Sequence, residues 1–315
     1  MSDMVNFTLK RIFHGIFVII AVTAILFSIM QMMPGDPIKL ISNPRIPEER
    51  IDELRHLWGL DKPGVVQYFY WLSNMLRGDL GTSIISGQKV MLLIAERLPY
   101  TLILTGTALI IQFVISVLLG LLAAYRRNTF FDRLIVNSAI ILRAVPIFWL
   151  GILFIMFFSL HLRVLPVSGY RGFKSLVLPL STLVLPYLAT NLRLTRSEVL
   201  EVLREKMVLT AYAKGLNHQQ VLFRHVLRNA LIPAVVMFFL NLPWIFGGSI
   251  IIERVFAWPG TGKLLWKSII AQDYPVVQGI ILIIALLTVL SNLTGDIITA
   301  LLDPRIRLEI SEEHI

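Results

Sequence analysis

The sequence predicts an all-α integral membrane protein with six transmembrane helices, and three observations support that fold class. Of the 315 residues, 56% are apolar and only 16% are charged, and the mean hydropathy is +0.74. A soluble domain of this size has too little interior to bury so much apolar surface, so lipid must surround part of the chain. The apolar residues also gather in six long segments, which predict helices because backbone groups inside a bilayer must hydrogen-bond within their own segment.

The six predicted spans differ in their charge and proline content. The first follows Lys10 and Arg11 and is not followed by a small-residue cleavage motif, so we expect an uncleaved anchor rather than a signal peptide. The second contains no charged residue, whereas prolines interrupt the fourth and the fifth. The spans are predicted at residues 12–33, 102–124, 134–160, 176–192, 231–252 and 276–302.

An even number of spans places both ends of the chain on one side of the membrane. Lys and Arg are slightly denser on the side of the N-terminus, which favours a cytoplasmic N-terminus only weakly. Residues 47–58 and 65–76 have helical patterns, the second amphipathic and rich in aromatics, so we expect a helical cap on the outer surface. The predicted divisions are the N-terminus with the first helix (1–33), an external helical loop (34–97), the transmembrane core (98–302, with an internal loop at 193–229) and an internal tail (303–315).

The residue inventory argues against catalysis, metal binding and nucleic-acid binding by this chain. The absence of Cys excludes disulfides and thiolate chemistry, and the six histidines form no metal-binding motif. Residues 260–263 superficially resemble a phosphate-binding loop, but Ala257 and Leu264 stand where that motif needs Gly and Ser or Thr, so ATP must be handled by another chain. The net charge of +9 fits basic residues flanking spans better than a nucleic-acid surface.

Three polar residues inside predicted spans are candidates for a translocation pathway: Arg143, Asn241 and Asp296. A charge at the bilayer centre costs about 2.5–3.5 kcal/mol on insertion scales, so Arg143 and Asp296 need a reason to be there. One reading is an ion relay or a contact with solute. The alternative, which we favour, is a structural ion pair or a side chain that extends to the interface.

The internal loop at 193–229 is too long for a plain connector. Residues 196–214 repeat apolar side chains at helical spacing, and the end of this predicted helix carries the small or short side chains of Thr210, Ala211 and Ala213. Small side chains allow the backbone of another protein to come close. An ordinary amphipathic surface helix would have the same spacing.

The end of this predicted helix also carries stop signals. Gly215 can take a positive φ and end the helix, and Lys214 lies favourably at the negative end of its dipole. Asn217 can cap a following helix, residues 218–231, which continues into the fifth span through Pro233. Such a continuous helix could transmit movement of the loop into the membrane.

Short motifs are spread along nearly the whole chain. In order they are PGDP at 34–37, WGLDKP at 58–63, GDLGTS at 78–83, TAYAKG at 210–215, LRNALIP at 227–233, GGS at 247–249, FAWPG at 256–260, DYP at 273–275 and DPRIR at 303–307. Together they resemble the permease subunits of ATP-binding-cassette (ABC) importers of the dipeptide, oligopeptide and nickel branch. TAYAKG and LRNALIP are similar to that family's "EAA" coupling motif, with Glu205 at its acidic position. Met207, Leu209 and Tyr212 depart from it, since they replace its usual Tyr and two Arg.

The resemblance implies a type I ABC importer (MetI-like) transmembrane domain that forms half of a pathway with a second, homologous permease. It implies two cytoplasmic ATP-binding subunits that hold ATP and magnesium, an extracytoplasmic solute-binding protein, and no cofactor on this chain. It also implies a prokaryotic inner membrane, with both termini and the 193–229 loop in the cytoplasm. The residues it assigns to ATPase coupling are Glu205, Thr210, Ala211, Ala213, Lys214 and Gly215.

The resemblance leaves the solute open between di- or oligopeptides, which we favour, and nickel, metal chelates or oligosaccharides. Two other classes remain as alternatives. An ion-coupled secondary transporter acting through Asp296 would usually need a richer polar set at the midplane. A membrane-embedded enzyme would turn over a substrate without partners.

Overall fold

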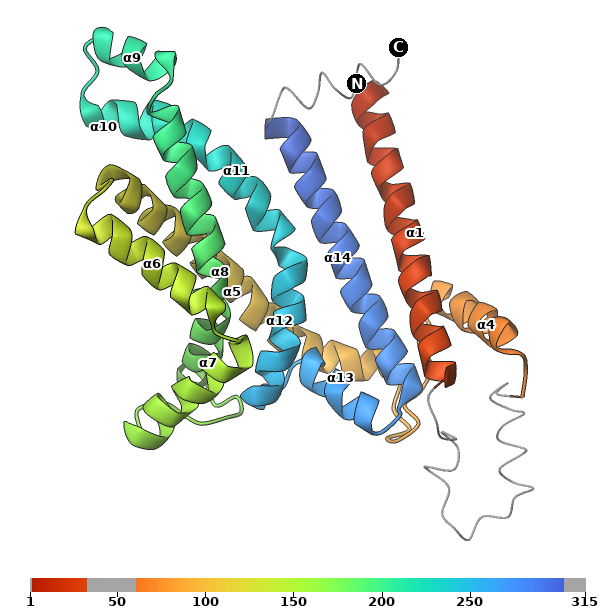
Figure 1. Ribbon diagram of the computed structural model, residues 1–315. Helices are drawn as coiled ribbons and strands as arrows, with labels where there is room; N and C mark the ends of the chain where they lie inside the picture. The colour runs from red at the N-terminus through yellow and green to blue at the C-terminus, as the bar shows by residue number, and fades with distance from the viewer. Residues whose placement is uncertain (1, 33–60, 303–315) are drawn as a thin grey trace.

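The computed structural model describes residues 2–32 and 61–302, so the predicted helix at 47–58 and the tail at 303–315 lie outside the described residues. The described residues are mostly helical, with one isolated β-bridge between Thr82 and Lys89 (Figure 1). Within these described ranges, five helical segments are long and apolar enough to cross a membrane, and a sixth span results if one bent helix pair is counted as a single crossing. The five are Asn6–Met32, Val90–Tyr125, Phe173–Val202, His218–Leu240 and Tyr274–Leu301.

The first and last long helices pair along their length. α1 (Ser2–Met32) packs against α14 (Tyr274–Leu302), and Gly15 permits the close contact because a Cβ there would lie 2.5 Å from Val289 Cγ1. The predicted amphipathic helix is present as α4 (Gly64–Leu76), which lies against α1. Its Tyr68 hydroxyl is 3.1 Å from Thr23 Oγ1, which fastens α4 to α1.

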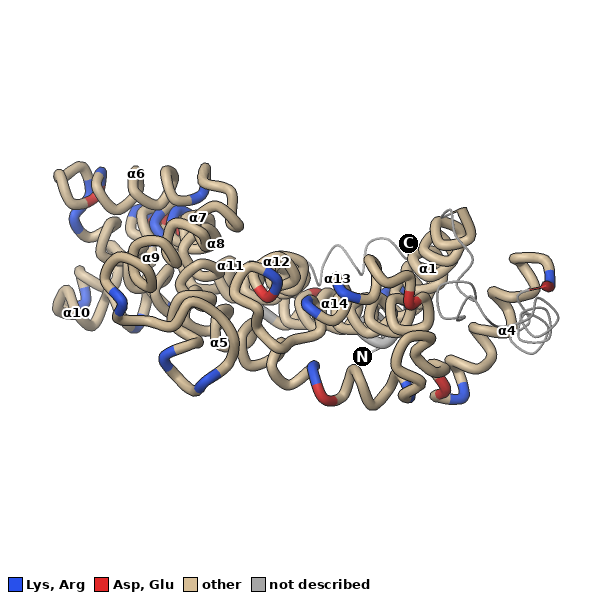
Figure 2. Tube along the Cα trace, turned by 90° about the horizontal axis from the view of Figure 1, so that it is seen from below, with Lys and Arg blue, Asp and Glu red and all other residues tan. Residues whose placement is uncertain are grey.

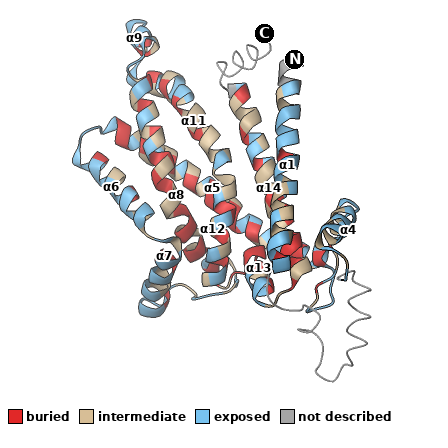
Figure 3. Cartoon of the chain, turned by 45° about the vertical axis from the view of Figure 1, so that its right-hand side comes forward, coloured by how far each residue is buried: buried red, intermediate tan, exposed pale blue. Residues whose placement is uncertain are grey.

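The centre of the molecule is the pair α5 (Val90–Tyr125) and α8 (Phe173–Val202), which pack against each other and both carry many buried positions (Figure 3). Gly120 lets the two helices approach, since a Cβ there would lie 2.8 Å from the Leu192 carbonyl oxygen. The predicted interruption of the fourth span is wrong, because α8 continues through Pro179 and Pro186. A membrane helix tolerates such prolines when groups on neighbouring helices hydrogen-bond the backbone carbonyls that the prolines leave free.

The predicted single helix at 134–160 is also wrong. The chain forms α6 (Phe130–Ala144), then α7 (Ile147–Phe154) with a π-helical end (Ile155–His161), and the two parts meet at 102°. The break follows from Pro146, because a proline forces the preceding residue out of the helical region. Val145 is accordingly extended, with φ −79° and ψ 126°.

The predicted helix at 196–214 is split in two. α8 ends at Val202, a turn follows, and a separate short helix, α9 (Lys206–Ala213), begins after Glu205. The next helices are α10 (His218–Val221), a π-helical turn (Leu222–Val226), α11 (Leu227–Leu240), α12 (Leu242–Val255) and α13 (Thr261–Ile270).

The predicted fifth span therefore divides at Asn241 into α11 and α12, where Pro243 stands in the first turn of α12. In Figure 1, α9 and α10 lie at the same end of the molecule as the start of α1 and the end of α14. We call this the tip end. α13 and the turn before it lie at the opposite end, the far end. Viewed from below, the helices form an elongated slab with α6 and α10 on one side and α4 on the other (Figure 2).

Candidate functional site: the coupling tip and the helices behind it

α9, the turn 214–217 and α10 form a projecting unit that we call the coupling tip (Figure 1). Its inner face packs in an apolar cluster shared with the ends of α5, α8 and α11. Val208 and Ala211 of α9 are buried there against Val221 and Val226. The predicted partner-facing role of Ala211 therefore needs correction in one respect, because its side chain points into the tip and holds α9 in place.

The outer face of the coupling tip is apolar and exposed. Leu209 and Tyr212 of α9 are 73% and 40% exposed, and Phe223, in the π-helical turn just after the tip, is 62% exposed. The other predicted coupling residues, Glu205, Thr210, Ala213, Lys214 and Gly215, are exposed as well. Exposed apolar side chains gathered on a projecting element mark a surface that contacts another molecule.

The turn inside the tip has the geometry that the sequence predicted. Gly215 has φ +82° and follows the last turn of α9, a conformation that favours glycine. The Asn217 side chain accepts from the Gln220 backbone N–H at 2.9 Å, and Gln220 returns the bond to the Asn217 N–H, which makes a complete capping box.

Two side-chain contacts make the tip a rigid unit. The Tyr212 hydroxyl lies 2.7 Å from His218 Nδ1, so α9 is fastened to the start of α10. The Asn229 amide lies 3.8 Å from Met207 Sδ, which connects α11 back to α9. The helix is continuous from His218 to Leu240, so α10 of the tip and α11 belong to one helical segment.

A partly buried ion pair supports the base of the tip, and no local sequence pattern predicts it. Arg196 of α8 donates through Nε to Asp132 Oδ1 at 2.7 Å and through NH2 to Oδ2 at 2.8 Å. The Asp132 side chain is 5% exposed and also accepts the Asn128 N–H. The start of α6 is thus locked to α8 where α8 leaves the core.

The structure gives the three pathway candidates separate surroundings. Arg143 is exposed in the last turn of α6 and forms no salt bridge with another described residue. Asn241, at the α11–α12 break, donates from its amide to Asn191 Oδ1 at 3.2 Å. Asp296 pairs with Arg11 of α1 at 3.2 Å.

A further polar contact lies just beyond Asn241. The Tyr187 hydroxyl of α8 donates to the Trp244 carbonyl at 3.1 Å, and the Trp244 side chain is 70% exposed. Gly248 makes room, because a Cβ there would lie 2.9 Å from the Tyr187 hydroxyl. The GGS motif marked this place in the sequence, but not the side chain that fills it.

Comparisons with known proteins agree with this architecture. Residues 116–308 match the family described as "Binding-protein-dependent transport system inner membrane component", and residues 4–105 match the corresponding N-terminal family. The oligopeptide transport system permease protein AppB of Bacillus subtilis is 38% identical over 96% of this chain and 99% of its own. The glutathione transport system permease protein GsiC of Escherichia coli O6:H1 is 38% identical over the same shares.

A solved structure supports the fold. A chain of the MetNI methionine ABC transporter in an inward-facing conformation superposes with a TM-score of 0.57 at 21% identity, covering 68% of this chain and 97% of that chain. At this identity the likeness concerns the fold alone. The family match extends across both the long N-terminal segment and the helical core. This chain therefore belongs to the family of inner-membrane components of binding-protein-dependent transport systems.

Proposed function

We propose that this chain is the permease subunit of an ATP-driven importer for di- or oligopeptides. The observation that carries the proposal is the 38% identity, over nearly the full length of both chains, to permeases named for oligopeptide and glutathione transport. Both of those solutes are short peptides. This similarity favours peptides over nickel, metal chelates and oligosaccharides.

In this proposal ATP is bound and hydrolysed by two partner subunits, and this chain converts their closure into movement. The exposed apolar face of the coupling tip seats against one ATPase, so the tip end lies in the cytoplasm together with both termini. The buried contacts of Ala211 and the Tyr212–His218 bond support a tip that moves as one body with α11. ATP binding then shifts the population between inward- and outward-facing states.

A second, homologous permease completes the translocation pathway, and an extracytoplasmic binding protein delivers the peptide at the far end. We keep Arg143, Asn241 and Asp296 as pathway candidates. The exposed cation at Arg143 suits the carboxylate of a peptide. The Asn191–Asn241 pair lies where the fifth span breaks, which is a place where a helix can bend during transport.

The test is uptake by proteoliposomes that contain this chain with its partner permease, ATPases and binding protein. Labelled tripeptides, glutathione, a nickel–histidine chelate and maltotriose are supplied outside, with ATP or a non-hydrolysable analogue inside. We expect ATP-dependent uptake of a peptide and none with the analogue. Uptake of only the chelate or the sugar would contradict the peptide assignment. Uptake that persists without ATP and collapses with an uncoupler would contradict the importer itself.

A further inference from the structure

A fully buried carboxylate lies at the far end, just beyond the predicted fifth span (231–252). Glu253 near the end of α12 is 0% exposed, and no part of the proposed mechanism uses it. Burying a carboxylate is costly unless donors satisfy it. Burial raises the pKa of Glu253 to about 7, although hydrogen bonds from Thr101, Lys263 and Gly262 act in the opposite direction.

The donors to Glu253 come from two other elements. Thr101 of α5 donates its hydroxyl to Oε1 at 2.7 Å. The backbone N–H groups of Gly262 and Lys263, in the first turn of α13, donate to Oε2 at 2.7 and 3.1 Å. The carboxylate therefore occupies the positive end of the α13 dipole and joins α12 to α5 and α13 at once.

The turn between α12 and α13 is built around this carboxylate. A Cβ at Gly260 would overlap the Glu253 carboxylate, and a Cβ at Gly262 would lie 3.0 Å from Oε2. Trp258 in the same turn is fully buried and donates its indole N–H to the Tyr100 carbonyl of α5 at 3.0 Å. These contacts fix the turn against one short stretch of α5.

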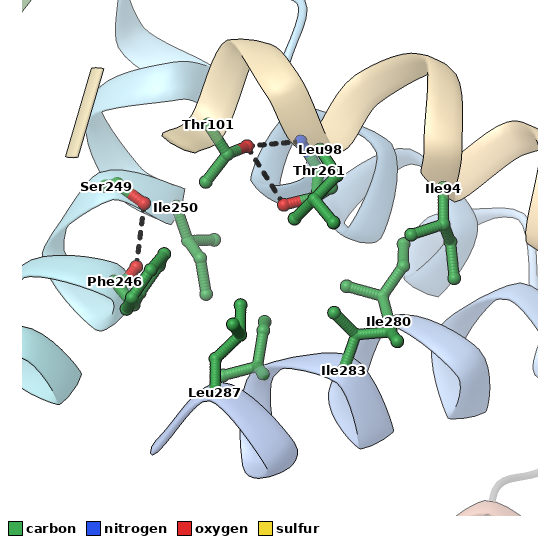
Figure 4. Close-up of a pocket in the computed structure, with 11 residues that line it drawn as sticks. Ile94, Leu98, Thr101, Phe246, Ser249, Ile250, Thr261, Ile280, Ile283 and Leu287 are labelled. Carbon is green, nitrogen blue, oxygen red and sulfur yellow. Dashed lines mark hydrogen bonds between the residues drawn. The ribbon is translucent and has the colours of Figure 1, made fainter. Parts of the chain in front are cut away.

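Thr101 is the second centre of the same arrangement. Its hydroxyl accepts the Thr261 N–H at 2.8 Å and lies 3.0 Å from the Thr261 hydroxyl (Figure 4). On the inner side, apolar side chains such as Ile94, Ile250 and Ile280 close a cavity of about 10 Å³, which holds at most about one water molecule.

The other end of α13 is also held to the segment that leads into α5. Asp273, just after α13, accepts the Ser83 hydroxyl at 2.5 Å and the Ile84 N–H at 3.0 Å. α13 is thus tied at both of its ends, while α12 continues from the helix that carries the coupling tip.

We propose that Glu253 is a positioning residue that makes α12, α13 and the adjoining part of α5 move as one unit during transport. We call Glu253, Thr101 and residues 260–263 the Glu253 joint. This inference rests on the proposed function, because it continues the movement of the coupling tip through α11 and α12 to the far end, where solute enters. Glu253 acts through the elements that it holds and does not contact the solute.

The chain has no Cys, so two introduced cysteines can carry spin labels without background. Leu102 of α5 is 42% exposed and Ile270 of α13 is 71% exposed, and both are suitable label sites. The distance between labels at L102C and I270C is measured by pulsed electron resonance in the complete complex, before and after ATP binding. We expect one unchanged distance in the otherwise native chain.

Glu253→Gln keeps an acceptor for Thr101 but places an amide donor against the N–H groups of α13. We expect Glu253→Gln to assemble normally and to broaden the distribution of label distances on ATP binding. We also expect it to lower the binding-protein-stimulated ATPase activity of the complex roughly tenfold. Thr101→Val removes a single hydroxyl and tests the same joint if Glu253→Gln assembles poorly. Glu253→Asp restores part of the activity. Glu96→Gln, on the exposed face of α5, is the matched control and leaves both readouts unchanged.

Two results would overturn the inference. One is a label distance that shifts on ATP binding in a transporting, otherwise native complex. The other is an unchanged distance with native uptake in Glu253→Gln or, where that variant does not assemble, in Thr101→Val. A native complex that takes up no peptide with ATP overturns the proposed function instead, so the two failures are distinguishable.

Discussion

The coupling tip and the Glu253 joint lie at opposite ends of the molecule, and they differ in solvent exposure. The tip exposes apolar side chains, whereas the joint is enclosed by the chain itself. The tip leaves Leu209 73% exposed and Tyr212 40% exposed, whereas Glu253 and Trp258 are fully enclosed by contacts within the chain. An exposed apolar face requires a partner, while an enclosed hydrogen-bond network holds its own elements together. In the proposed mechanism the tip receives the movement of the ATPases, and the joint passes it on as a rigid unit.

The largest expected effect concerns the base of the tip. Asp132→Ala leaves Arg196 of α8, whose side chain is 25% exposed, without its partner and removes two charge-assisted hydrogen bonds, each of which contributes about 1.5–3 kcal/mol. We expect a marked fall in the melting temperature of the purified chain in detergent. Asp132→Asn keeps one side-chain oxygen as an acceptor, so its melting temperature should fall less. A melting temperature unchanged in Asp132→Ala would show that the tip needs no such support.

The joint predicts a pH dependence of stability. The folded pKa of Glu253, about 7, lies above its ordinary value of 4.5, because burial disfavours the charged form. Between pH 4.5 and pH 7, Glu253 therefore holds a proton in the folded chain that it loses in the unfolded chain. Its contribution to the free energy of unfolding falls by roughly 2–3 kcal/mol as pH rises through this range.

The melting temperature is to be followed from pH 5 to pH 8 in the native chain and in Glu253→Gln. The ammonium group of Lys263 is turned to the Ala257 carbonyl, and the guanidinium of Arg254 lies over the Trp266 ring. We expect the native chain to lose stability toward high pH relative to the variant. Parallel curves would contradict the burial argument.

A substitution at Gly215, in the turn of the tip, should have a smaller effect on stability. Gly215 has φ +82° with open space around it, so a side chain there meets backbone strain and no clash. Gly215→Val should cost about 1–2 kcal/mol and disturb the tip. Gly215→Asn, which tolerates this conformation better, is the control and should retain more uptake. Equal uptake by the two variants would show that the turn does not transmit force.

The smallest effect is expected at Asp296. Its pair with Arg11 is partly exposed, with side chains 24% and 48% accessible, and such pairs contribute about 0–1 kcal/mol. Asp296→Asn should therefore leave the melting temperature nearly unchanged. A selective loss of ATP-driven uptake would support its place in the pathway, and unchanged uptake would leave it a structural residue only.

The sequence predicts the turn of the tip, because the turn depends on residues that are neighbours in sequence. It does not predict contacts between residues that are far apart in sequence. Gly215 and Asn217 behave as their φ preference and capping chemistry require, because these depend on neighbours in sequence. The inward direction of Ala211 depends on how α9 meets α10, and a period of 3.6 residues does not reveal it. Thr101 and Glu253 are 152 residues apart, so no local pattern connects them.

Proline was the least reliable sequence signal. The sequence predicts that Pro179 and Pro186 interrupt a span, yet α8 continues through both because it is packed on several sides. Pro146, in a span expected to be continuous, breaks it by 102°, where α6 and α7 are largely exposed. The tertiary surroundings, which the sequence does not show, decide which proline breaks a helix.

The central claim is that partner ATPases drive this chain through the exposed face of the coupling tip, and Leu209 tests it most directly. Leu209→Asp changes a side chain that is 73% exposed, so folding and assembly should be preserved, while the apolar contact is lost. In proteoliposomes containing the complete complex, we predict ATP-driven peptide uptake at least about tenfold lower than native. Leu209→Met, which keeps the face apolar, should transport normally. Native uptake by an assembled Leu209→Asp complex would contradict the account.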